Sequence, residues 1–177
     1  MGHDISAYIK TKSTSHEDIG MRCDNEVAYF RIGAFNTSRQ RLFYGILPNA
    51  MTANAGVSGD GSTLDFTEDD IKRAISACKY FMDDDSALRE HLLEQRMDAE
   101  DSIKKFADTF QQLMFQQLQI TPETKPIVDR LVSNEDMSIE DARENLASIW
   151  KFHEDILSAY NDVKKDDDSA QIQIYFG

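Results

Sequence analysis

The last six residues, Ile172-Gln173-Ile174-Tyr175-Phe176-Gly177, decide the fold of this chain. Their β-branched and aromatic side chains predict a strand, although the sequence before them is largely acidic helix. A strand in this position can reach the core only by pairing with an earlier strand. We therefore expect residues 1–65 and 170–177 to share one sheet portion of a single domain, with residues 66–169 as a helical portion between them.

The N-terminal sequence supplies partners for this strand. From Asp4 to Lys10, apolar and polar residues alternate with the period of two that is typical of a half-buried strand. Glu26–Ile32 carries apolar residues on both faces, which predicts a second, more central strand. Arg41–Leu47 fits either a third strand or a short helix, and Asn49–Leu64, with its glycines, is expected to be a surface loop.

Helical signals begin at Thr67-Glu68-Asp69-Asp70. Thr67 is suited to cap the first turn, and the three acids lie at the positive end of the helix dipole. A longer helix is predicted from Ser86 to Gln119, and the acidic stretch around Asp98 is the place where it can break. The apolar stripe of the first helix consists of Ile71, Ala74, Ile75 and Cys78, and either Phe81 or Met82 is a candidate to extend it.

The most regular pattern starts at Ser138, which forms a second capping pair with Asp141. Apolar positions then recur at spacings of three and four, which predicts a seam that packs along another helix. Ser86–Gln119 is the predicted helix of comparable length, so we expect these two to pack together; pairing between two copies in a homodimer is the alternative. The seam positions are Ile139, Ala142, Leu146, Ile149, His153, Ile156, Tyr160 and Val163.

These elements predict an α+β fold. A small, mainly antiparallel sheet is built from the N-terminal strands and the C-terminal strand, and a long acidic helical hairpin or bundle is inserted between them. The single-domain expectation agrees with a length of 177 residues, and ten Phe, six Tyr and one Trp are enough for a sizeable core.

The net charge of the chain indicates which kinds of partner it can bind. The chain has 32 Asp and Glu against 19 Lys and Arg, for a formal net charge of −13. Nucleic-acid binding and anionic membrane binding both need a basic footprint, and the basic clusters here do not exceed pairs such as Lys72/Arg73. A signal peptide and a membrane-length apolar run are not visible either, so we expect a soluble cytoplasmic protein with free thiols.

Catalytic and metal-binding motifs are not recognisable. The sequence contains no GxSxG, no GK[ST] and no HExxH, so we predict no catalytic residue, no metal site and no cofactor, and an enzyme is the less favoured class. Cys78 is expected to be inert core, and His153 is expected to be a core or interface histidine with a nitrogen bonded to a neighbouring polar group.

The remaining chemically distinctive residues lie at the sheet end. Arg31 is expected to form an internal ion pair, and Cys23 lies beside Arg22, whose charge would lower the thiol pKa. A small-ligand site for a nucleotide or another anion is the alternative function here, either as a binding protein or as a small enzyme. Its candidate residues are His3, Asp4, Tyr8, Cys23, Arg31 and Gly59.

The leading functional prediction is a non-enzymatic, acidic protein-interaction or regulatory module. Its partner would be a protein, and a basic one if the module acts as an inhibitor or imitates nucleic acid. The interaction surface would lie on the helical portion, where carboxylates and a Gln/Met/Phe-rich stretch are found. Its candidate residues are Glu94, Asp98, Glu100, Gln112, Phe115 and Gln116.

Overall fold

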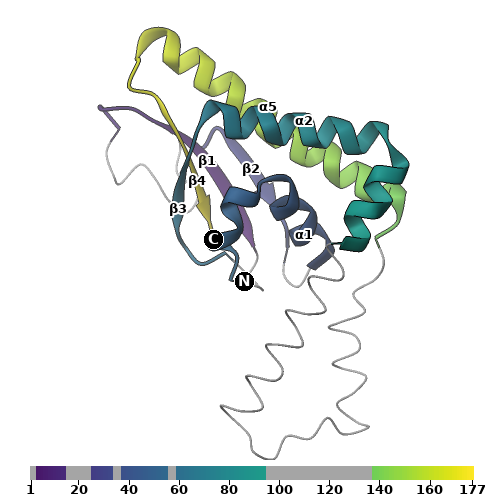
Figure 1. Cartoon of the computed structure of the whole chain (residues 1–177). Helices are drawn as coiled ribbons and strands as arrows, with labels where there is room; N and C mark the ends of the chain where they lie inside the picture. Colours follow the sequence, from purple (N-terminus) through teal and green to yellow (C-terminus); the bar gives the residue numbers. More distant parts are fainter. Residues whose placement is uncertain (1–2, 15–24, 34–36, 56–58, 95–136) are drawn as a thin grey trace, which may run out of the picture.

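The computed structural model describes residues 3–14, 25–33, 37–55, 59–94 and 137–177. The strands and helices form an α+β fold (Figure 1). Along the chain, most of the helices come between the N-terminal strands and the C-terminal strand. A further helical stretch spans residues 85–94. The named elements are β1 (Asp4–Lys10), β2 (Ala28–Arg31), α1 (Thr37–Ile46), the 3-10 helix η2 (Pro48–Ala53), β3 (Thr63–Phe66), α2 (Glu68–Asp83), α5 (Ile139–Asp166) and β4 (Gln171–Phe176).

The four strands form one antiparallel sheet in the order β2-β1-β4-β3. β4 lies between β1 and β3, and its Ile174 is opposite Ala7 on one side and Leu64 on the other. The predicted return of the C-terminal strand to the N-terminal sheet is therefore confirmed, and the last strand occupies an interior position.

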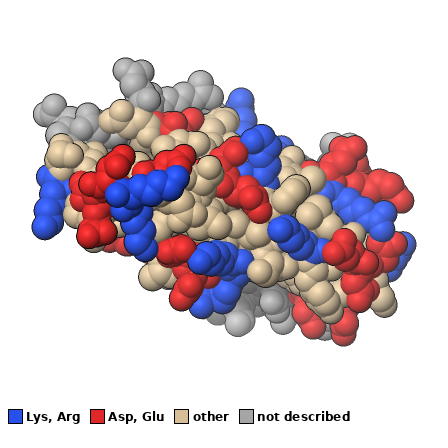
Figure 2. All heavy atoms as spheres, turned by 90° about the horizontal axis from the view of Figure 1, so that it is seen from above, with Lys and Arg blue, Asp and Glu red and all other residues tan. Residues whose placement is uncertain are grey.

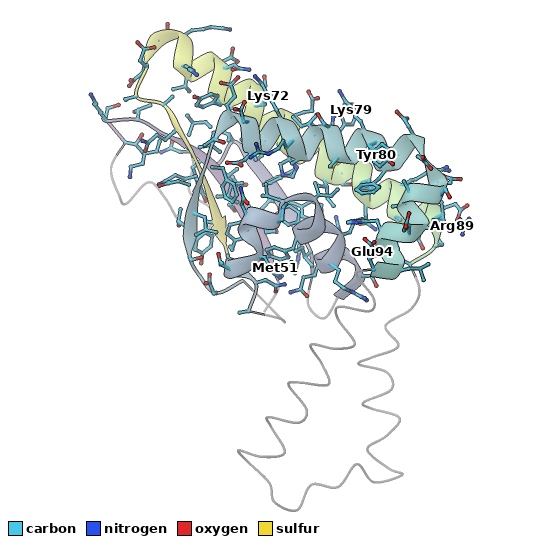
Figure 3. All side chains as sticks on the ribbon, in the orientation of Figure 1. Met51, Lys72, Lys79, Tyr80, Arg89 and Glu94 are labelled. Atoms are coloured by element: carbon cyan, nitrogen blue, oxygen red, sulfur yellow. The ribbon has the colours of Figure 1, made fainter. Side chains whose placement is uncertain are left out.

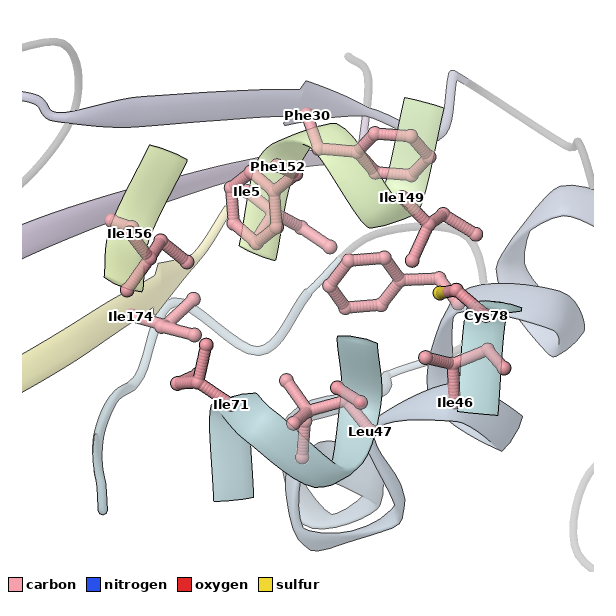
Figure 4. Packing of buried hydrophobic residues seen from close by; sticks show 14 of the residues in the cluster. Ile5, Phe30, Ile46, Leu47, Ile71, Cys78, Ile149, Phe152, Ile156 and Ile174 are labelled. Atoms are coloured by element: carbon pink, nitrogen blue, oxygen red, sulfur yellow. The ribbon is translucent and has the colours of Figure 1, made fainter. Parts of the chain in front are cut away.

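Alternation along the strands decides which face of the sheet meets the helices. Ile5 of β1, Phe30 of β2 and Ile174 of β4 are buried in one cluster with the apolar sides of α1, α2 and α5 (Figure 4). The intervening residues, such as Asp4 and Tyr8, lie on the opposite face. One face of the sheet thus makes the core, as expected for helices packed on one side of an antiparallel sheet.

α2 and α5 form an antiparallel hairpin along this core (Figure 1). Ion pairs join opposite ends of the two segments: Lys164 Nζ lies 3.2 Å from Glu68 Oε2, and Arg143 pairs with Asp85 just beyond α2. The seam helix therefore packs against α2, and its predicted pairing with Ser86–Gln119 stays a prediction. Only the first part of that predicted helix is described, and the rest lies outside the described residues.

Both predicted helix starts are confirmed. The Thr67 hydroxyl accepts a hydrogen bond from the Asp70 amide, and the Asp70 carboxylate accepts one from the Thr67 amide, which completes a capping box. Ser138 caps α5 by accepting from the Asp141 amide at 3.0 Å. The predicted apolar stripe of α2 is buried, and so is the α5 seam up to Tyr160, while Val163 is partly buried.

Two predicted strand assignments need correction. Arg41–Ile46 is helical within α1, which ends one residue before Leu47, so the short-helix alternative holds. The consecutive residues Leu42, Phe43 and Tyr44 are all fully buried, and a strand would have turned Phe43 to the opposite face. The second strand, predicted to be central, is the edge strand β2; its Phe30 faces the core while Tyr29 is exposed.

The predicted surface loop at Asn49–Leu64 also contains regular structure. η2 occupies Pro48–Ala53 and buries Ala50 and Ala53, and β3 begins at Thr63. Among the described residues, β3 is an edge strand that pairs with β4, and its alternation of polar Thr63 and Asp65 with apolar Leu64 and Phe66 covers just four residues.

Ile174→Ala tests the interior position of β4. Ile174 is fully buried between two strands, so removing its side-chain methyl groups should lower the free energy of unfolding by about 3 kcal/mol. Gln171→Ala, at the exposed start of the same strand, should change it by less than about 0.5 kcal/mol. Urea unfolding measures both, and equal losses would contradict this placement of β4.

Candidate functional site

The residues predicted for a ligand site at the sheet end are divided between the two faces of the sheet. His3 shares the core face with Ile5 and is 1% exposed. Asp4, Tyr8 and Arg31 belong to the opposite face. Cys23 lies outside the described residues. The described part of the structure therefore does not gather these side chains into one cluster.

On the core face, His3 pairs with Tyr44 of α1. His3 Nε2 lies 2.8 Å from the Tyr44 hydroxyl. Burial lowers the pKa of His3 in spite of the nearby Asp4 carboxylate. Burial, assisted by the charge of Asp60, raises the pKa of Tyr44. The hydrogen bond therefore joins two neutral groups at neutral pH and ties β1 to α1.

On the opposite face, Arg31 meets Asp4. Arg31 Nε lies 3.7 Å from Asp4 Oδ1, across the β1–β2 register, and Tyr29 donates its hydroxyl proton to the same carboxylate. An ion pair was predicted for Arg31, but this one is solvent-exposed and not internal. Exposed pairs of this kind stabilise a fold by only about 0–1 kcal/mol.

The middle of this face consists of polar side chains that bond to each other. Ser6 donates to Glu26 at 2.5 Å, and Gln173 of β4 donates to Asp65 of β3 at 2.6 Å. Tyr8 lies among them and is buried. These bonds satisfy polar groups across the strands, which is a structural role that sequence alternation alone does not reveal.

Gly59 serves the backbone of the sheet. Its amide donates to the Gly177 carbonyl at 3.2 Å, and a Cβ at this position would lie 2.4 Å from the Phe176 carbonyl carbon and oxygen. The Gly61 amide likewise donates to the Phe176 carbonyl at 2.8 Å. A phosphate cradle needs amides that point to the ligand, and these two donate to carbonyls at the end of β4 and directly after it.

On the helical portion, Glu94 is exposed and is the last described residue of the 85–94 helix. Two large apolar side chains accompany it in sequence: Tyr80 of α2 is 57% exposed and Leu93 is 60% exposed. Figure 3 shows Tyr80, Arg89 and Glu94 on this part of the helical layer. The other predicted interaction residues lie outside the described residues: Asp98, Glu100, Gln112, Phe115 and Gln116.

Sequence reasoning missed Tyr80 and Leu93. Tyr80 falls outside the α2 stripe that includes Ile75 and Cys78, so a helical projection carries a signal for its exposure. Leu93 likewise falls outside the stripe formed by Leu88 and Leu92, which are spaced four residues apart, so the same kind of signal was present for it. Partial burial of Leu92 and exposure of Leu93 follow from the tertiary packing.

The charges of the helical layer are mixed. Lys and Arg side chains lie among the Asp and Glu side chains over α2 and α5 (Figure 2). Lys72 pairs with Glu68 at 2.7 Å, and Lys151 pairs with Asp155 at 2.8 Å. Much of the acidity visible on this face is thus locally compensated, which is the usual arrangement for a solvated helix surface.

The two other candidate reactive groups are buried. Cys78 is fully buried in the core, and burial raises the pKa of its thiol to about 12. His153 is also fully buried, which confirms the predicted core position. Its Nδ1 lies 2.7 Å from the Ile149 carbonyl oxygen, so one nitrogen has the polar partner that was predicted. Thiolate chemistry at Cys78 is disfavoured by this setting.

In the described ranges, no group of three or more His, Cys, Asp or Glu side chains is arranged to hold a metal ion. Among the helices that the structure describes, none is long and apolar enough to span a membrane. Comparison with protein families, curated proteins and solved structures gives no match to this chain. Functional inference therefore rests on the residues of the chain itself.

Tyr44→Phe tests the buried pair. Loss of the hydroxyl leaves His3 Nε2 buried without its partner, so the free energy of unfolding at pH 7 should fall by about 1–3 kcal/mol. Tyr29→Phe is the matched control, because its hydroxyl bonds to Asp4 at the surface, and it should change stability by less than about 0.5 kcal/mol. Equal effects in urea unfolding would show that the buried bond does not hold α1 to β1.

Proposed function

We propose that this chain is a non-enzymatic protein-interaction module that binds a basic partner protein. Its contact surface is the 79–94 surface, defined as the exposed side chains of residues 79–94 at the end of α2 and on the helix that follows. The observation that carries the proposal is the exposure of two large apolar residues, Tyr80 and Leu93, within one short acidic segment.

Apolar exposure supplies the binding energy in this proposal. Large side chains such as Tyr are enriched among the residues that dominate protein interfaces, especially where polar residues surround them. Phe81 stands next to Tyr80 with ring centroids 5.3 Å apart, and it stacks on His91 with centroids 4.3 Å apart. These ring contacts brace Tyr80 and join α2 to the following helix, which limits the ordering that a partner has to impose.

Charge supplies the preference for a basic partner. Residues 79–94 contain five carboxylates, Asp83, Asp84, Asp85, Glu90 and Glu94, and two cations, Lys79 and Arg89. Lys79 and Asp85 are paired with residues of α5, whereas the segment as a whole keeps an excess of negative charge. Together with the net charge of −13, this excess would speed encounter with a positively charged surface.

A binding function also agrees with the placement of the reactive groups. His3, Cys78 and His153 are buried against neighbouring side chains, so in the described structure they are placed to hold elements together. A regulatory or inhibitory action on a nucleic-acid-binding protein is the finer form of the proposal. A cytoplasmic setting, in which thiols stay reduced, is part of the same proposal.

Affinity capture with matched variants tests this function. The surface variant is Tyr80→Ser/Leu93→Ser/Glu94→Lys, and the control is Asp162→Lys, at an exposed site near the other end of α5. We expect wild type and control to retain the same basic partner, and the surface variant to bind it at least tenfold more weakly at equal helix content.

Retention of that partner by the surface variant would contradict the proposal. So would a thermal shift of several degrees with a nucleotide that Arg31→Ala abolishes, because that result favours the small-ligand site at the sheet end. Light scattering on the free chain separates a third outcome: if the surface variant dissociates a homodimer, the partner is a second copy of the chain.

A further inference from the structure

His153 of α5 lies within a cluster of phenylalanine rings. The imidazole is stacked on Phe43 of α1 with ring centroids 6.0 Å apart, and it meets Phe152 edge to face at 5.2 Å. Phe30 of β2 stacks on Phe43 at 5.2 Å and extends the cluster towards the sheet. The histidine is fully buried, so solvent does not reach either nitrogen in this structure.

The two nitrogens of this imidazole have different surroundings. Nδ1 lies 2.7 Å from the Ile149 carbonyl oxygen, which can only accept, so Nδ1 carries the proton of the neutral ring. Nε2 is buried and, among the described residues, has no hydrogen-bond partner. A second proton would have to bind at Nε2, where it would place a charge in apolar surroundings.

α1 is the helix that a second proton on His153 would affect most. Its residues Phe43 and Tyr44 contact two buried imidazoles, His153 from α5 and His3 from the β1 side. α1 has only ten residues, with no acid in its first turn and no base in its last. A helix of this length is marginal in water, so it depends on docking against its neighbours.

We propose that α1 is an acid-released helix: a proton on His153 undocks α1 from the core while α2, α5 and the sheet remain assembled. Burial lowers the pKa of His153 to about 4, and the Ile149 carbonyl opposes this shift only in part. α2 and α5 stay paired in acid. Hydrogen bonds and cations lower the pKa of Glu68 and Asp70 in the first turn of α2, so these carboxylates keep their charge and their bonds as the pH falls.

No surrounding charge changes this conclusion. Arg39 is a cation whose pKa burial lowers, and a positive charge near the cluster opposes a second one. At 6.0 Å the Phe43 ring lies at the outer limit for attraction to an imidazolium, so it offsets only part of the burial effect. Among the described residues, the titratable or charged side chains on α1, α2 and α5 and in or beside β1 that are not fully exposed are Arg39, Arg41, Tyr44, Glu68, Asp70, Cys78, Glu154, Asp155, Tyr160, His3, Asp4, Tyr8 and Lys10.

The expected size of the effect follows from linkage. Released α1 leaves His153 near its ordinary pKa of 6.5, whereas docked α1 holds it near 4, so docking weakens as pH falls from about 6.5 to about 4. Between pH 7 and pH 5 the docking equilibrium should fall about twentyfold.

Hydrogen exchange followed by mass spectrometry, corrected for the intrinsic pH dependence of exchange, measures this release. In the full wild-type chain we expect protection of residues 37–46 to fall about twentyfold between pH 7 and pH 5, with α2 and α5 unchanged. His153→Leu should reduce the pH dependence to the part that the buried His3, which also contacts α1, contributes. His91→Leu is the matched control, because His91 also stacks on a phenylalanine, Phe81, but on another part of the helical layer.

Two results would overturn the proposal: an equal loss of protection in α1, α2 and α5, which indicates global unfolding, or an unchanged pH dependence in His153→Leu. NMR titration of wild-type His153 keeps the test decisive if that variant does not fold. A midpoint well below 6.5, with α1 resonances changing at the same pH, supports release; a midpoint near 6.5 with α1 unchanged contradicts it.

Discussion

β4 pairs with β1 on one side and with β3 on the other, and these backbone bonds join segments from the two ends of the chain. The Asp4 amide donates to the Gly177 carbonyl at 2.9 Å, and the Gly177 amide donates to the Asp4 carbonyl at 2.8 Å. Among the described strands, β1 would lose one of two partners without β4 and β3 would lose its sole partner, leaving their amides and carbonyls unpaired beside the core. The apolar face that receives α5 and α2 exists because this pairing aligns Ile5, Ile174 and Phe66 on one side.

Local patterns predicted the elements whose signals are strong and short-range. β1 and β4 alternate, α2 and α5 carry caps and periodic stripes, and these elements appear where expected. α1 was ambiguous because burial of consecutive residues removes its periodicity. β3 was missed because it has only four residues and gains its stability from pairing with a strand far along the chain. The α2–α5 pairing depends on tertiary geometry, which the length of the seam alone does not fix.

The candidate site shows the same division. Sequence reasoning identified His3 and Arg31 as unusual, but the alternation of β1 places His3 on the core face while Arg31 lies on the other. The partner of His3, Tyr44, lies 41 positions away on an element of uncertain type, so no local signal joins the two. The 79–94 surface exists because Tyr80 and Leu93 are not buried in the core. Buried histidines against α1 and exposed apolar residues beyond α2 thus give the helical layer two separate roles: holding the fold together and, as proposed, binding a partner.

Thermal unfolding of a chain lacking Gln171–Gly177, followed by circular dichroism beside the full chain, measures how far the domain depends on β4. Because the truncation exposes the apolar face of the sheet and removes the strand with which β3 pairs in the described sheet, we expect the truncated chain to lose its cooperative transition. A truncated chain that unfolds cooperatively at the same temperature as the full chain would show that the helical portion and the N-terminal strands are stable without β4, which would contradict a single sheet closed by the C-terminal strand.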